Sequence, residues 1–155
     1  MKKSYILICM FFLILTGCEN EKENTKNEYI AMKNQVFNDK NYKDKEVPVE
    51  IITTIERIDE EEINYKVTIK NPQEDMHNIK AMVVHNYYNE DTFPSVGVFD
   101  EPKELLSNID NTNELILKDT IKTTKNLSKL ELELKIWIEY TNNSGEKKDI
   151  YYKTT

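Results

Sequence analysis

The chain has 155 residues and carries 21 basic against 28 acidic side chains, a formal net charge of -7. This acidic balance argues against a nucleic-acid partner, because phosphate binding needs clustered lysine and arginine. It also argues against electrostatic docking on anionic lipid. Glycine and proline are scarce, at 3 and 4 copies, and the many tyrosine, isoleucine, valine and threonine residues favour strands over long helices.

The N-terminal segment has the pattern of a bacterial export signal. Lys2 and Lys3 precede an unbroken apolar run from Tyr5 to Leu15. As a helix, this run spans roughly 16 Å, about half of the hydrocarbon core of a membrane. The run is therefore better suited to a signal peptide than to a membrane-spanning helix.

The residues that follow carry the more specific signal. Leu15-Thr16-Gly17-Cys18 resembles the lipobox of bacterial lipoproteins, an aliphatic residue and two small residues before a cysteine. The resemblance implies a diacylglyceryl thioether on Cys18, fatty acids such as palmitate, and cleavage between Gly17 and Cys18 by the lipoprotein signal peptidase. Two acyl chains are enough for stable anchoring. We therefore expect a signal peptide at 1–17 and a lipid anchor on the outer face of the cell membrane.

Two alternatives to the lipoprotein interpretation stay open, an ordinary secretory signal and an uncleaved anchor, each with an incidental cysteine. Whichever of these three interpretations holds, residues 18–46 are expected to be an N-terminal polar tether, because residues 19–28 contain no apolar side chain. Farther along, Val36 and Phe37 can lie against the domain. The folded domain itself is expected at residues 47–155.

From Val47 onward the hydrophobic pattern has the period of two that is typical of strands with one buried face. The stretch 79–88 is apolar on both phases, which favours a central strand that is covered on both sides, or partly covered by a loop. Residues 100–113 are expected to be a polar connection with a helical turn at 101–106. The strands are expected at 47–56, 63–70, 79–88, 93–99, 115–123, 130–140 and 150–152.

These seven short strands predict an all-β fold, a single antiparallel Greek-key β-sandwich. The segment YKVTIKNPQEDMHNIKAMVV resembles the second and third strands of immunoglobulin-like and fibronectin type III-like domains. The segment LELELKIWIEYTNNSGEKKDIYYKTT resembles their last hairpin. The resemblance implies an immunoglobulin-like architecture for residues 47–155 and no particular activity.

A search for catalytic or metal-binding residues nominates none, and no cofactor is expected. His77 and His85 are eight residues apart, without a cysteine or a further histidine, and we expect a turn residue and a half-buried strand residue instead of a metal pair. No serine after the signal segment lies in a nucleophile elbow; these serines are Ser95, Ser107, Ser128 and Ser144.

The last hairpin allows its register to be predicted. If Asn143-Ser144-Gly145 is a three-residue loop with Gly145 in the left-handed region, Trp137 faces Tyr151. The same register pairs two apolar positions on the inner face, Ile138 with Ile150 and Ile136 with Tyr152.

Trp137, the only tryptophan, is the one residue that suggests a binding face. Alternation along the strand places it among charged side chains, and an exposed pair of Trp137 and Tyr151 has the composition of an interface hot spot. The alternative, favoured by the usual burial of large aromatics, is that Val36, Phe37 or the 100–113 loop covers Trp137.

Together these features favour a membrane-anchored surface lipoprotein that acts as a non-catalytic binding module, with a protein or cell-wall component as its partner. One alternative is a small cell-envelope enzyme with a site built from Asp, Glu and Tyr side chains. The missing nucleophile–base set argues against it. The other is a structural or immunity-type lipoprotein that shields a membrane component.

Overall fold

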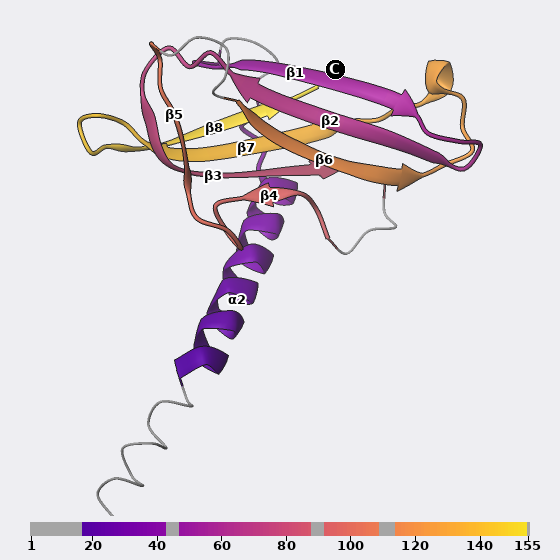
Figure 1. The fold of residues 1–155 in the computed structure, drawn as a ribbon. Coiled ribbons are helices and arrows are strands. Elements are labelled where there is room, and N and C mark those ends of the chain that lie inside the picture. The colour runs from indigo at the N-terminus through magenta and orange to yellow at the C-terminus, as the bar shows by residue number, and fades with distance from the viewer. Residues whose placement is uncertain (1–16, 43–46, 88–91, 109–113, 155) are drawn as a thin grey trace, which may run out of the picture.

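The computed structural model describes residues 17–42, 47–87, 92–108 and 114–154 (Figure 1). These ranges hold a long helix, a short 3-10 helix and eight strands. In chain order the elements are α2 (Gly17–Asn38), β1 (Glu50–Arg57), β2 (Glu62–Lys70), β3 (Met76–His85), β4 (Ser95–Val96), β5 (Lys103–Leu105), β6 (Leu115–Lys122), η1 (Leu127–Lys129), β7 (Leu134–Thr141) and β8 (Lys147–Lys153).

The strands form two antiparallel sheets. The smaller sheet has the order β1-β2-β6, and the larger has the order β4-β3-β7-β8. The short strands β4 and β5 follow one another along β3, opposite Ala81 and Met82 and opposite Met76 and Ile79 respectively. The predicted all-β, antiparallel architecture is confirmed, and the sheets lie one above the other with α2 beneath the larger one (Figure 1).

Alternating aliphatic side chains from both sheets fill the core. On β2, the inward positions Ile63, Tyr65, Val67 and Ile69 are fully buried. They meet the inward positions of β7 in one hydrophobic cluster, namely Leu134, Ile136, Ile138 and Tyr140. The period of two in the sequence therefore identifies the core faces of both strands.

The central strand β3 is apolar on both phases because both of its faces are covered, as predicted for 79–88 (Tyr88 lies outside the described residues). Ala81 and Val83 point into the core between the sheets. Met82 and Val84 point to the opposite side and join a second cluster formed with residues of α2. The helix α2 provides this second cover together with Phe93, from the connection before β4.

The last hairpin has the predicted register. Trp137 pairs with Tyr151, and the positions on either side pair as expected. Gly145 has a φ of 78°, in the left-handed region, and its N–H donates to the Asn142 carbonyl at 2.9 Å. This glycine closes the loop and thereby fixes which residues of β7 and β8 face each other.

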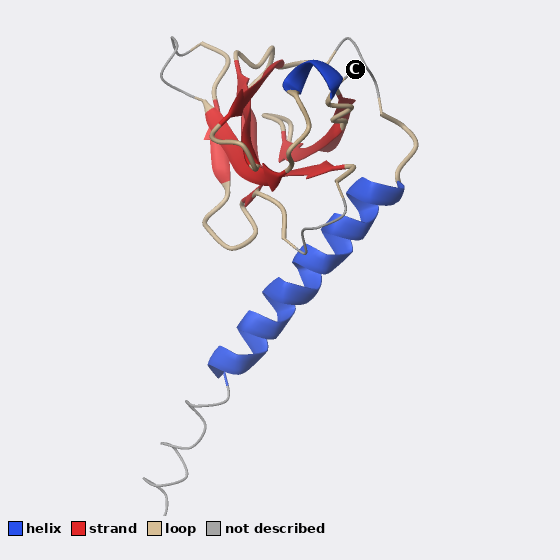
Figure 2. Ribbon diagram, turned by 90° about the vertical axis from the view of Figure 1, so that its right-hand side faces the viewer, coloured by secondary structure: helices blue, strands red, loops and turns tan. Residues whose placement is uncertain are grey.

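The polar tether predicted for residues 18–46 is wrong for its first part, because residues 17–38 form the helix α2. Tyr29, Met32 and Val36 are buried, and their spacing of three and four residues puts them on one face of a helix. The packed unit therefore begins inside α2 and not at residue 47. Figure 2 shows α2 crossing beneath the sandwich, with its N-terminal end running away from it.

Two further predictions need correction. The helical turn expected at 101–106 is the strand β5, because β3 has a free edge there with which residues 103–105 pair. The strand expected at 130–140 begins only at Leu134. Leu130 and Leu132 still pack against the core, but they lie in the connection after η1.

Candidate functional site

The residues of the predicted lipobox lie at the start of the described chain. Leu15 and Thr16 lie outside the described residues, and Gly17 and Cys18 begin α2. From residue 22 to residue 28, the side chains of α2 are exposed, except for the half-buried Thr25. Within the described residues, no helix has the length and apolar character needed to cross a membrane.

The second half of α2 is bound to the outer face of the larger sheet. Tyr29, Met32 and Val36 are 7%, 5% and 0% exposed. They share a cluster with four side chains from the sheet and its connections, namely Met82, Val84, Phe93 and Trp137. This contact converts the outer face of a strand pair into a second core.

Polar contacts fix the direction of α2 on the sheet. Lys80 on β3 forms an ion pair with Glu28. Near the end of the helix, Lys135 Nζ donates to the carbonyl of Phe37 at 2.9 Å, and Gln35 Nε2 donates to the Tyr151 hydroxyl at 2.7 Å. Contacts at both ends of the packed segment resist rotation and sliding of the helix.

The prediction that Trp137 and Tyr151 form an exposed pair is wrong. The register brings the two residues together as predicted, but Trp137 is only 3% exposed because α2 covers it. Its indole Nε1–H donates to Asp149 Oδ1 at 2.9 Å, which satisfies the one polar atom of the ring. The alternative interpretation, cover by Val36 and Phe37, is the one that the structure shows.

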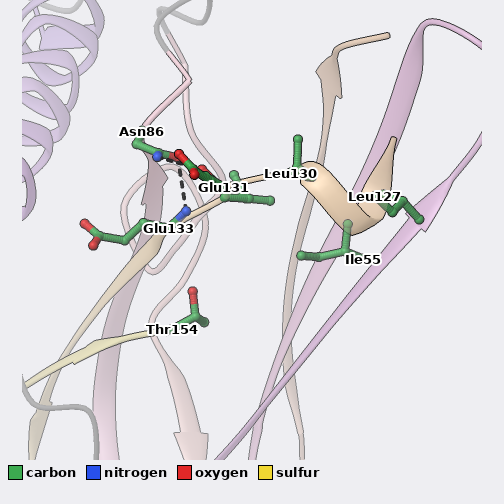
Figure 3. A pocket seen from close by; sticks show the side chains of 8 residues that line it. Ile55, Asn86, Leu127, Leu130, Glu131, Glu133 and Thr154 are labelled. Carbon is green, nitrogen blue, oxygen red and sulfur yellow. Dashed lines mark hydrogen bonds between the residues drawn. The ribbon is translucent and has the colours of Figure 1, made fainter. Parts of the chain in front are cut away.

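A hollow lies at the end of the sandwich where the connection between β6 and β7 passes from one sheet to the other (Figure 3). Its volume is about 520 Å³. Ile55, Leu127 and Leu130 form its apolar side, and Asn86, Glu131 and Thr154 lie on its other side. The sequence offered no motif for this hollow, because its residues come from four separate segments.

The polar side chains of this hollow already bind the backbone. Asn86 Nδ2 donates to the carbonyl of Glu131 at 2.9 Å, and Asn86 Oδ1 accepts from the N–H of Glu133 at 3.1 Å. Thr154 Oγ1 accepts from the N–H of Leu134 at 3.0 Å. These bonds hold the chain in place before β7 begins, which is a structural use of the amide and the hydroxyl.

A polar network occupies the opposite end of the strands. His77 Nδ1 lies 3.1 Å from Glu104 Oε1, and His77 Nε2 lies 2.8 Å from Asn143 Oδ1. Asn143 Nδ2 donates to Asp75 Oδ2 at 3.0 Å, and Ser107 donates to Asp75 Oδ1 through its N–H and its hydroxyl, each at 2.8 Å. The network joins β3 and β5 to the turn between β7 and β8.

The network shifts the pKa values of its ionisable groups. Hydrogen bonds from Ser107 and Asn143 lower the pKa of Asp75 to about 2. Hydrogen bonds with Asn143 and Glu104 raise the pKa of His77. The network is not a hydrolytic triad, because Ser107 donates to the carboxylate of Asp75 and not to a histidine base.

The two histidines are in different environments. His85 is 2% exposed, and its ring lies edge-on to Tyr65 and Phe93 with centroids 5.6 and 5.0 Å away. Eight residues along one strand, at about 3.3 Å each, place His85 roughly 26 Å from His77, too far apart to share a metal ion. Among the described residues, His, Cys, Asp and Glu form no group of three placed to hold a metal.

Comparisons with known proteins identify no family for this chain. No model of a protein family matches the chain, and no curated protein matches it. Among solved structures, the chain is similar to the sporulation control protein Spo0M from Bacillus subtilis, with a TM-score of 0.28 and 12% identity. The similarity covers 70% of this chain and 49% of that one, so the chain spans about half of its length. At this TM-score, the likeness carries no argument about function.

Proposed function

We propose that this protein is a lipid-anchored bacterial lipoprotein whose β-sandwich acts as a non-catalytic binding module at the outer face of the cell membrane. The observation that carries the proposal is the position of α2. Its second half is bound to the larger sheet through Tyr29, Met32 and Val36, and its first half, mostly exposed from residue 22 to residue 28, leads to Cys18. A chain that ends in a lipidated Cys18 is held at the membrane through a helix that belongs to the folded unit.

The strand order supports an immunoglobulin-like, Greek-key subtype for the sandwich. The sheets β1-β2-β6 and β4-β3-β7-β8 are joined by connections that pass between sheets, from β2 to β3 and from β6 to β7. In immunoglobulin-like domains, consecutive strands are likewise divided between two sheets. Such folds host many unrelated functions, so the function is proposed from the side chains and not from the fold.

A binding role agrees with how the polar side chains are used. Asn86 and Thr154 in the end hollow bind backbone groups, and Asp75 and His77 bind neighbouring side chains. Asp75 accepts the hydroxyl hydrogen of Ser107, but its lowered pKa of about 2 makes it a weak base that does not activate the serine. The partner is then a protein or a cell-wall component, met by surface contact.

The outer face of the smaller sheet points away from α2 (Figures 1 and 2). Ile52, Thr68 and Ile116 lie side by side there on three adjacent strands, and the two isoleucines are 37% and 45% exposed. On a chain anchored through Cys18, this face is turned from the membrane toward the surroundings.

Metabolic labelling with a fatty-acid analogue tests the anchor. We expect wild-type protein to take up the label and to fractionate with membranes, whereas Cys18→Ala takes up none. Cys9→Ala is the matched control, because Cys9 lies within the export segment and not in the lipobox, and it should be labelled like wild type. Label in Cys18→Ala, or its loss from Cys9→Ala, contradicts the proposal.

A further inference from the structure

The hydrogen-bond partners of His77 favour its protonated form. Nδ1 faces a carboxylate oxygen of Glu104, and Nε2 faces the amide oxygen of Asn143. An ionised carboxylate and an amide oxygen only accept hydrogen bonds. Both contacts are therefore hydrogen bonds only when both ring nitrogens carry hydrogen, that is, when the ring is an imidazolium.

The orientation of the Asn143 amide decides whether its oxygen or its NH₂ group faces His77, because an amide can be turned by 180°. Its Nδ2 lies 3.0 Å from Asp75 Oδ2. Asp75 accepts three hydrogen bonds, two of them from Ser107, and its lowered pKa of about 2 keeps it ionised. The carboxylate therefore requires the NH₂ group of Asn143, and this leaves the oxygen for His77.

His85 provides the contrast within the same strand. Its Nδ1 accepts the backbone N–H of Tyr87 at 3.2 Å. An accepting ring nitrogen offers its lone pair, whereas His77 Nδ1 faces a carboxylate oxygen that only accepts. The two histidines thus differ in the hydrogen-bonding role of Nδ1 for a geometric reason.

We propose that His77 is a pH-sensitive latch, which as an imidazolium holds β5 and the β7–β8 turn to the start of β3. Glu104, a carboxylate, retains the hydrogen on Nδ1 more strongly than an amide oxygen retains the one on Nε2. The proton lost at higher pH therefore comes from Nε2. Its bare lone pair then faces Asn143 Oδ1, and the contact that holds the turn becomes repulsive.

Rotation of the Asn143 amide does not compensate for the lost hydrogen bond between His77 Nε2 and Asn143 Oδ1. Turning it gives Nε2 a donor but points Oδ1 at the carboxylate of Asp75, so one repulsive contact replaces another. The backbone of β3 is irregular at the same place, since its pairing with β5 and with β7 shifts register around Asn78, whose φ is 52°. Such bulges re-aim side chains, and this one begins directly after His77.

The surrounding charges favour the closed latch. The charged groups that face His77 are Glu104 from β5 and Asp75 from the connection before β3, and both are negative. Lysines on neighbouring strands are paired with other residues, Lys103 with Asp100, Lys147 with Glu139 and Lys148 with Glu74. Because the pKa of His77 is raised, its contribution to stability is full below the unfolded value of about 6.5 and is lost as pH rises through the folded value.

Nuclear magnetic resonance on the full chain in detergent micelles tests the latch. At a pH of about 6.5, we expect the doubly protonated ring to be the main form of His77, because its pKa is raised. Raising the pH should shift the side-chain amide signals of Asn143 and the backbone signal of Gly145 with the midpoint of His77. The amide protons of Asn143 should exchange several-fold faster above that midpoint.

Three variants separate the latch from a general pH effect. Glu104→Gln and Asn143→Ala should each lower the pKa of His77, because the first removes the negative charge beside Nδ1 and the second removes the acceptor beside Nε2. Glu50→Gln is the matched control: it removes a surface ion pair with Lys70 in the other sheet, and it should leave His77 unchanged. A neutral His77 at or below its ordinary pKa, or Asn143 and Gly145 signals that ignore its titration, overturns the proposal.

Discussion

At the scale of single residues, two glycines with nearly the same backbone conformation differ in their surroundings. Gly97 and Gly145 have φ values of 72° and 78°. A Cβ on Gly97 would lie 2.3 Å from the carbonyl oxygen of Ile79, whereas a Cβ on Gly145 meets no atom within 4 Å. Gly97 is thus required for the close approach of the chain to β3, and Gly145 only for its dihedral angle.

Replacing each glycine by alanine separates these two effects. We expect Gly145→Ala to lower the free energy of unfolding by about 1 kcal/mol, the cost of a left-handed alanine. Gly97→Ala should lower it by roughly 2–4 kcal/mol, because the backbone of β3 must also move. Urea unfolding of both variants measures the difference, and equal losses would show that Gly97 has no steric role.

Trp137 shows how far sequence reasoning reaches at this scale. Alternation and the hairpin loop predicted its phase and its partner Tyr151 correctly. They left its burial open, and it was the usual burial of large aromatics that favoured cover by Val36, Phe37 or the 100–113 loop. Val36, which does cover it, lies about a hundred residues earlier in the chain. Period and register are local properties, whereas burial of the outer face depends on a distant contact.

At the scale of elements, strands were predicted better than the helix and the short pairings. β2 and β7 have alternating apolar residues, and the core requires that alternation. In α2, only Tyr29, Met32 and Val36 mark the buried face, and the polar residues around them suggested disorder. Their spacing was the signal that could have revealed the helix. β5 is too short to have a pattern, and its pairing depends on the free edge of β3.

The packing of α2 can be tested through the tryptophan that it covers. In wild type, we expect a blue-shifted Trp137 emission that resists acrylamide. Val36→Asp should shift the emission to the red and increase quenching, because it puts a charge against the apolar face of the sheet. Asn34→Asp is the matched control, since Asn34 is exposed on the same helix. If both variants keep the wild-type emission, α2 does not cover Trp137.

At the scale of the whole molecule, α2 gives the sandwich a definite orientation. Its packed half lies on the larger sheet, its N-terminal half leads to Cys18, and the smaller sheet faces the opposite direction (Figure 1). A flexible tether of ten residues can reach about 35 Å in any direction. The same ten residues as a helix rise only about 15 Å along one axis. The proposed anchor would therefore hold the domain close to the membrane with one face outward.

Paramagnetic broadening by spin-labelled lipid headgroups tests this orientation most directly, on the lipidated protein in nanodiscs. We predict strong broadening near Lys22, weaker broadening at Tyr29, and the least at Ile52 and Ile116 on the smaller sheet. Protein without the fatty acid is the control and should show none of this gradient. Broadening that is equal on both sheets, or strongest at Ile52 and Ile116, would contradict the orientation proposed here.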